Sequence, residues 1–71
     1  MGNENIKRSV KIAGHATSIT LEPPFWQELQ NIAKEKSLSV NALITHIDEN
    51  RQTINLSSAV RVYILHHYIN K

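Results

Sequence analysis

The chain has 71 residues, a net charge of +2 and no cysteine, and 41% of its residues are hydrophobic. This length predicts one thin domain, the missing cysteine excludes disulfides and thiolate metal sites, and the apolar share is too high for a disordered chain. Because no apolar run approaches the ~18 residues of a membrane span and no secretory signal is recognisable, we expect a cytoplasmic domain that is reinforced by partner chains.

The beginning of the chain is basic. Residues 1–6 are expected to form a flexible N-terminus, and a single domain is expected over residues 7–71. Lys7, Arg8 and Lys11 crowd this beginning against a single acidic residue. A basic arm of this kind is a candidate contact to nucleic-acid phosphates, although a solvated tail would have the same composition.

Alternating polar and apolar residues predict a strand region over residues 9–22. Its β-branched residues favour strand over helix. Gly14 marks a bulge or the corner of a hairpin, so the pattern leaves open whether residues 9–13 extend one long ribbon strand or form a separate strand. Because side chains of a strand alternate between its faces, two sets are predicted: Thr17, Ile19 and Leu21 on one face, and Ala16, Ser18 and Thr20 on the other.

Three helices are predicted after the strand region, over about residues 24–36, 40–50 and 57–69. Pro23 and Pro24 end the strand, and proline is well tolerated in the first turn of a helix. Ser39 has the side chain of a good N-cap for the second helix. Either Asn55 or Ser57 caps the third helix.

The third helix is apolar around most of its circumference. Its apolar residues include Leu56, Val60, Tyr63 and Ile64 on one side, and Val62, Leu65 and Ile69, which widen the apolar surface. A helix that is apolar nearly all round is normally buried, and a chain of this size has little of its own to bury it with. The pattern therefore favours association with a second chain.

A strand followed by helices also points to a homodimer. A lone strand leaves backbone groups unpaired on both edges, and even an isolated hairpin is marginal in water. Pairing with the same strand of a second chain about a two-fold axis satisfies these groups. The expected fold is therefore mainly α with a short N-terminal strand region: an intertwined homodimer with an antiparallel intermolecular β-ribbon and an additional C-terminal helix. The dimer core is expected to comprise Ile19, Leu21, Phe25, Trp26, Leu43, Ile44 and Ile47.

Several short segments stand in a distinctive order between residues 7 and 69. They are KRSV (7–10), GH (14–15), TSITLE (17–22), FW (25–26), KSLSV (36–40) and NLSSAVRV (55–62). Each segment alone is a weak signal. Together they resemble the ribbon-helix-helix family, and most closely a group of short bacterial ribbon-helix-helix proteins of largely unassigned role.

The resemblance implies a DNA-binding homodimer, commonly a transcriptional repressor, whose two-stranded ribbon fits the DNA major groove. In this family outward strand side chains read base edges, and the N-terminus of the second helix holds a phosphate, as its free N–H groups and dipole favour. By position the base-facing residues are Ala16, Ser18 and Thr20. The phosphate contacts are Ser39, Val40 and Asn41, together with the basic Lys7, Arg8 and Lys11.

The chain departs from the family pattern in three respects. Family readers are often Arg, Lys, Asn or Gln, whereas Ser18 and Thr20 discriminate bases poorly and Ala16 offers only apolar contact. A third helix lies outside the minimal plan of the family. The segment from Asn55 onward also resembles a family second helix, in which case residues 40–50 would be an insertion, but the turn length favours the first alignment.

No motif for catalysis is recognisable. The sequence shows no nucleophile with a placed base and no Gly-rich phosphate loop, and the chain has little volume to enclose a pocket. His66 and His67 point about 100° apart on a helix, and His46 has only Asn50 at ligand spacing. We expect no enzyme, no cofactor and no metal.

Two functions remain open. The first is a dimeric DNA-binding protein, a transcriptional regulator that reads the major groove with its β-ribbon. The alternative is a homodimeric protein-interaction module that docks a partner protein, or forms higher oligomers, through its C-terminal helix. Exposure of Val62, Leu65 and Ile69 would favour the alternative, and their burial within a homodimer would remove its docking surface.

Overall fold

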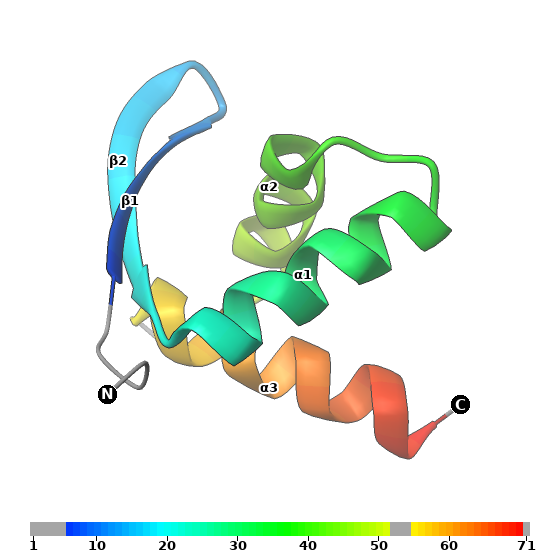
Figure 1. The fold of residues 1–71 in the computed structure, drawn as a ribbon. Coiled ribbons are helices and arrows are strands. Elements are labelled where there is room, and N and C mark those ends of the chain that lie inside the picture. The colour runs from blue at the N-terminus through cyan, green and yellow to red at the C-terminus, as the bar shows by residue number, and fades with distance from the viewer. Residues whose placement is uncertain (1–5, 52–54, 71) are drawn as a thin grey trace.

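A computed structural model describes residues 6–51 and 55–70, and most of the expected flexible N-terminus, residues 1–5, lies outside them. Two strands and three helices follow in the order β1 (Ile6–Ile12), β2 (His15–Leu21), α1 (Pro23–Glu35), α2 (Val40–Asn50) and α3 (Leu56–Ile69). Figure 1 shows the two strands on one side of the molecule and the three helices packed together beside them. A two-stranded antiparallel sheet followed by three helices confirms the predicted fold class.

β1 and β2 form a hairpin within one chain. Their antiparallel register pairs residues 6–12 with residues 21–15, so β1 is a strand of its own and not an extension of β2. The two turn residues, Ala13 and Gly14, both have positive φ, 52° and 82°. Tight two-residue hairpin turns require this geometry, and glycine adopts it without steric cost. Because this turn folds β1 back, β1 pairs with β2 within the chain, and pairing of the ribbon with a second chain stays a prediction.

Side-chain caps fix the beginnings of α2 and α3. The Ser39 hydroxyl accepts a hydrogen bond from the Ala42 N–H at 3.0 Å. Of the two candidate caps of α3, Asn55 is the one used, because its Oδ1 accepts from the Ser58 N–H at 3.1 Å. Each cap satisfies one of the backbone donors that the first turn of a helix leaves unpaired.

The turn between α1 and α2 has a left-handed residue that is not glycine. Ser37 has a φ of 57°. Its N–H donates to the Lys34 carbonyl at 3.1 Å, and the Leu38 N–H donates to the Ala33 carbonyl at 2.8 Å. These two bonds close the end of α1 in the arrangement for which glycine is usually chosen.

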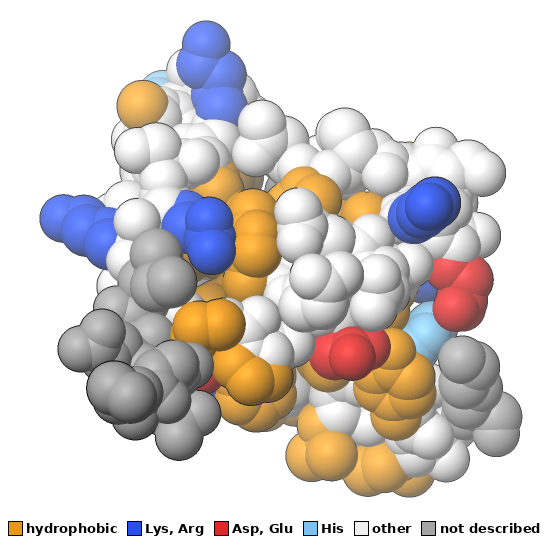
Figure 2. Space-filling view, in the orientation of Figure 1, with side chains coloured by type: hydrophobic (Ala, Val, Ile, Leu, Met, Phe, Trp, Pro, Cys, Tyr) orange, Lys and Arg blue, Asp and Glu red, His pale blue; other side chains and the backbone are white. Residues whose placement is uncertain are grey.

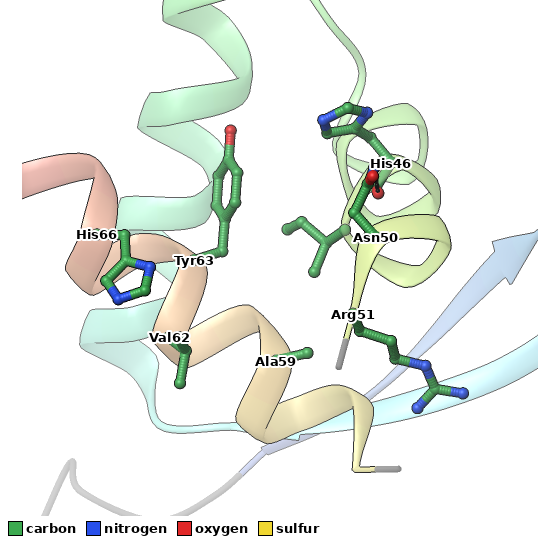
Figure 3. Close-up of a pocket in the computed structure, with 8 residues that line it drawn as sticks. His46, Asn50, Arg51, Ala59, Val62, Tyr63 and His66 are labelled. Atoms are coloured by element: carbon green, nitrogen blue, oxygen red, sulfur yellow. Dashed lines mark hydrogen bonds between the residues drawn. The ribbon is translucent and has the colours of Figure 1, made fainter. Parts of the chain in front are cut away.

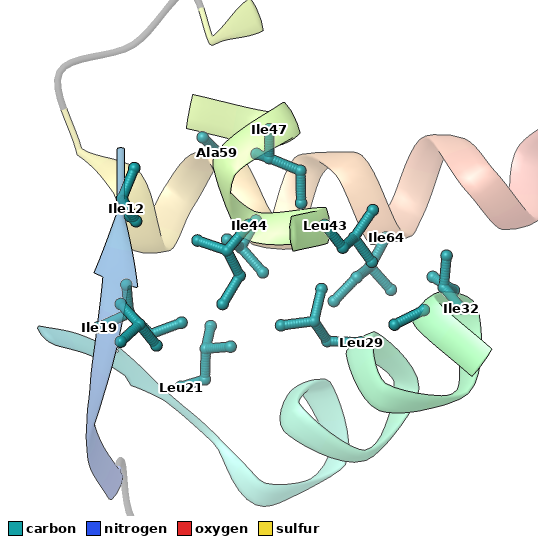
Figure 4. Packing of buried hydrophobic residues seen from close by; sticks show 13 residues of the cluster. Ile12, Ile19, Leu21, Leu29, Ile32, Leu43, Ile44, Ile47, Ala59 and Ile64 are labelled. Atoms are coloured by element: carbon teal, nitrogen blue, oxygen red, sulfur yellow. The ribbon is translucent and has the colours of Figure 1, made fainter. Parts of the chain in front are cut away.

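The core lies between the inner face of the hairpin and the three helices (Figure 4). Five residues of the predicted dimer core are buried within the single chain: Ile19, Leu21, Leu43, Ile44 and Ile47. The other two, Phe25 and Trp26, pack half-buried against them. The remaining buried residues are Val10, Ile12, Leu29, Ile32, Ala33, Ala59, Val60 and Ile64.

Polar contacts fasten α3 to the start and the middle of α1. Arg61 Nε donates to the Glu22 carboxylate at 3.0 Å. Hydrogen bonds from its own backbone amide and from Arg61 lower the pKa of Glu22. The Tyr68 hydroxyl donates to Glu28, and this hydrogen bond raises the pKa of Tyr68.

α3 is buried on one side only. Ala59, Val60 and Ile64 face the core, whereas Val62 and Leu65 are exposed. The single chain therefore covers only part of the apolar circumference that the sequence predicted to be buried. Within residues 6–51 and 55–70, no helix combines the length and the apolarity that crossing a membrane requires.

Candidate nucleic-acid interface

The hairpin presents a polar face away from the helices. Opposed residues of an antiparallel pair point to the same side of the sheet, and successive pairs alternate. The pairs that contain Val10 and Ile19 face the helices, because these two side chains are buried. The alternate pairs face outward: Lys7 with Thr20, Ser9 with Ser18, and Lys11 with Ala16.

The predicted base-facing residues lie in one row on this outward face. Ala16 and Ser18 are exposed, and Thr20 is half-buried at the end of the row. The neighbouring row on β1 consists of Lys7, Ser9 and Lys11. Ser9 was not among the predicted site residues, although its position between the two lysines in the alternating pattern is a signal that could have identified it.

The charge of the face is positive. Lys7 and Lys11 are exposed on it, and its six residues include no acidic side chain. In Figure 2 most of the visible Lys and Arg side chains lie over the hairpin, whereas the larger acidic areas lie over the helices. A surface of this kind attracts a polyanion by charge and offers hydroxyl groups for hydrogen bonding.

Arg8 lies on the opposite face of β1 from the two lysines. Its guanidinium stacks over the Trp26 ring, with 4.4 Å between its Cζ and the ring centroid. Among the described residues, the buried Arg8 Nε meets no hydrogen-bond partner. Arg8, Val10 and Ile12 are alternate residues of β1, so their side chains point to the same side of the sheet, toward the helices. The structure therefore brings together Lys7 and Lys11 and separates Arg8 from them.

The outer edge of β2 is covered at Thr20 by the beginning of α3. The Thr20 N–H donates to the Ser57 hydroxyl at 3.1 Å, and its carbonyl accepts from Arg61 Nη2 at 3.4 Å. Because both backbone groups of a strand residue point to the same side, a second strand could not pair with β2 over its full length. Figure 1 shows α3 starting beside this end of β2.

The predicted phosphate contact at the N-terminus of α2 lies apart from the hairpin face. The Ser39 hydroxyl caps the helix, and Val40 and Asn41 are its first two residues. The loop from α1 enters α2 on the side away from the hairpin (Figure 1). Within one chain, this helix N-terminus and the outward face therefore do not form a continuous surface.

A hollow of about 460 Å³ lies between the end of α2 and α3. Ile47, Ala59 and Val62 give it apolar walls, and His46 and His66 stand on its opposite sides (Figure 3). Among the described residues, no three His, Asp or Glu side chains come together where they could hold a metal ion.

The outward side of α3 carries exposed apolar side chains. Val62, Leu65 and Ile69 follow at helical spacing and are 48%, 56% and 65% exposed. We call these three residues the α3 stripe. In Figure 2 a group of hydrophobic side chains is visible at the bottom of the molecule, where Figure 1 places α3. A cluster of apolar side chains on a surface typically marks an interaction site.

Comparisons with known proteins identify similar chains. Residues 5–68 match the family model described as "Ribbon-helix-helix domain". Among solved structures, an uncharacterized protein from Bordetella pertussis Tohama I is similar, with a TM-score of 0.80 and 33% sequence identity over 96% of this chain. The chain spans 58% of the length of that protein. No curated protein matches it.

Proposed function

Because this chain belongs to the ribbon-helix-helix domain family, we propose that it is a homodimeric DNA-binding protein, a transcriptional regulator that represses a promoter. The family generally comprises DNA-binding regulators. The observation that carries the proposal is the outward face of the hairpin, on which Lys7, Ser9 and Lys11 lie beside Ala16, Ser18 and Thr20. A two-stranded ribbon of this width fits the major groove.

The two kinds of side chain on this face have different roles. Lys7 and Lys11 neutralise DNA phosphates, which gives affinity without sequence preference. Ser18 and Ser9 lie opposite each other at the middle of the face, and their hydroxyls donate to or accept from base edges. Thr20 has a smaller role because its side chain is half-buried. The predicted phosphate contact at Val40 and Asn41 is not part of this proposal, because the N-terminus of α2 lies apart from the hairpin face.

Selection from genomic DNA tests the proposal directly. The purified protein is incubated with pooled genomic fragments at low and moderate salt, and the retained fragments are sequenced. We expect a shared, roughly palindromic site and an affinity that falls steeply with salt. Failure to retain DNA at low salt would contradict the proposal, and so would retention without sequence preference that disappears at modest salt.

Substitutions on the hairpin separate affinity from specificity. Lys11→Ala is expected to weaken binding to selected and random DNA alike, because a phosphate contact is lost. Ser18→Ala is expected to reduce the preference for the selected site by about 1 kcal/mol, the value of one hydrogen bond. Binding is measured by fluorescence anisotropy on both DNAs. Lys36→Ala removes the same charge from the end of α1 and should change neither the affinity for DNA nor the preference for the selected site. Equal losses for all three variants would exclude a phosphate contact by Lys11 and a base contact by Ser18.

A second candidate function is a homodimeric protein-interaction module that docks a partner protein through α3. The exposure of the α3 stripe favours it. A dimer with no affinity for DNA at low salt, and with Leu65 still accessible to solvent in that dimer, would support this function over DNA binding.

A further inference from the structure

We infer that the hollow between the end of α2 and α3 binds a small organic anion with an apolar body, of the class of aromatic carboxylates. The inference is independent of the proposed DNA binding, because it concerns two helices and not the outward face of the hairpin. The hollow measures about 460 Å³, and sites for small ligands typically measure about 300–1,000 Å³. Its size therefore suits one small molecule.

The walls of the hollow are mainly apolar. Ile47 of α2 and Ala59 of α3 are buried, at 4% and 7% exposure, and both line it. Val62 extends the wall on the α3 side, and Tyr63 adds an aromatic ring (Figure 3). Walls of this kind bind a flat aromatic or aliphatic group through its apolar area and through ring stacking.

Three side chains that can form hydrogen bonds stand around these walls: Tyr63, His46 and His66. Figure 3 shows the ring of Tyr63 between the two histidines. Within residues 6–51 and 55–70, none of the three side chains has a hydrogen-bond or ion-pair partner. An apolar recess with a few converging polar groups is typical of a small-ligand site, where the polar groups fix the orientation of the ligand.

The charges around the hollow favour an anion over a cation. Among the described residues that line it, none is acidic. The charged lining residue is Arg51, and its partner Asp48, at 3.0 Å, does not line the hollow. Ala59 lies in the first turn of α3, where the positive end of the helix dipole also attracts negative charge. The imidazole and phenol groups can donate hydrogen bonds, so they suit the oxygens of a carboxylate.

This site does not depend on the outward side of α3. Of the α3 stripe, Val62 lines the hollow, whereas Leu65 and Ile69 lie outside it. A ligand in the hollow contacts α2 and α3 together. Because it binds the folded chain and not the unfolded one, it should also raise the melting temperature of the protein.

Naphthaleneacetate is the probe that tests the inference, and naphthaleneacetamide is its uncharged counterpart of nearly the same shape. Both are titrated into isotope-labelled protein without DNA and followed by two-dimensional NMR. The acetate should bind with a dissociation constant of about 0.1–1 mM, as expected for a ligand of this size. The acetamide should bind at least about threefold more weakly, because charge-assisted hydrogen bonds are the stronger ones. The largest shifts should fall on Ile47, Ala59 and Tyr63.

The two tyrosines of the chain provide matched variants. Tyr63→Phe removes only the hydroxyl at the hollow and should weaken binding of the acetate about fivefold, the value of one hydrogen bond. Tyr68 lies further along the same helix, outside the hollow, and its hydroxyl donates to Glu28. Tyr68→Phe should therefore leave the affinity for the acetate unchanged. Circular dichroism confirms that both variants are folded.

Several results would overturn the inference. No saturable binding of the acetate in the millimolar range would exclude the site, and equal affinity for acetate and acetamide would exclude an anion as its ligand. Shifts confined to residues outside the hollow would place the ligand elsewhere. Signals of Ile47 and Ala59 that change with protein concentration alone would show that a second copy fills the hollow. None of these results bears on the contact between the hairpin and DNA, since the titrations contain no DNA.

Discussion

Arg8 and Lys11 are close in the sequence and carry the same charge, but they lie on opposite faces of β1. Arg8 stacks on Trp26, a contact worth about 1 kcal/mol when partly desolvated. Arg8→Ala is therefore expected to lower the free energy of unfolding by about that amount, whereas exposed Lys11→Ala should change it by less than about 0.5 kcal/mol. Urea denaturation of the two variants measures the difference. Equal stability of both variants would show that the stacking contributes nothing.

Glu22 links acid stability to the contact between α1 and α3. Its pKa is lowered in the folded state, so its contribution to stability is present above the unfolded value of about 4.3 and is lost as pH falls through the folded value. Glu22→Gln should therefore lower the melting temperature at neutral pH. The difference from wild type should shrink below about pH 4. Glu49→Gln, at an exposed position at the end of α2, is the control; an equal pH profile for both variants would contradict the prediction.

Side-chain direction could be predicted from the sequence along the strands. Alternation was sufficient to group Ala16, Ser18 and Thr20, and the structure places them on one face. The same alternation separates Arg8 from Lys7 and Lys11, although their shared charge and nearness in the sequence suggest one group. The stacking of Arg8 on Trp26 could not be predicted, because it joins two elements whose relative placement depends on the tertiary fold.

At the level of elements, two serines in one turn should respond in opposite ways. Ser37 is held at a positive φ, which costs a residue with a Cβ about 1 kcal/mol or more relative to glycine. Ser37→Gly should therefore stabilise the protein by about 0.5–1 kcal/mol, after the greater unfolded-state entropy of glycine is counted. Ser39→Ala removes the N-cap of α2 and should destabilise it by about 1 kcal/mol. Thermal denaturation of both variants at one protein concentration measures the two changes in stability. A destabilised Ser37→Gly variant would contradict backbone strain at Ser37.

The helices were predicted within about one residue of their ends because caps and proline mark boundaries locally. The sequence did not distinguish a hairpin of two strands from one long bent strand. Gly14 is compatible with a bulge in one strand and with a tight turn, and only the pairing of β1 with β2 distinguishes them. Long-range pairing of this kind leaves no local signature beyond the alternation that both arrangements share.

At the level of the whole molecule, the core residues were recognisable and the chain that buries them was not. Ile19, Leu21 and Leu43 were predicted to be interior, and they are fully buried in one chain. Apolar pattern reports that a residue is buried, but it does not report which chain covers it. The same limit applies to α3, where the pattern did not distinguish the covered side from the exposed stripe.

The salt dependence of DNA binding reports how many hairpins contact one duplex. One hairpin presents Lys7 and Lys11, and each neutralised phosphate contributes about −0.9 to the slope of log K against log salt. A single copy should thus give about −1.8, and a homodimer that places two hairpins on one duplex about −3.6. Lys7→Ala removes one phosphate contact per copy, so it should bring the slope of the dimer to about −1.8, as measured by fluorescence anisotropy on the selected site. Lys36→Ala removes a charge from the end of α1 and should keep the full slope. A wild-type slope near about −1.8 would show that only one hairpin contacts the DNA, and it would contradict binding by a dimer.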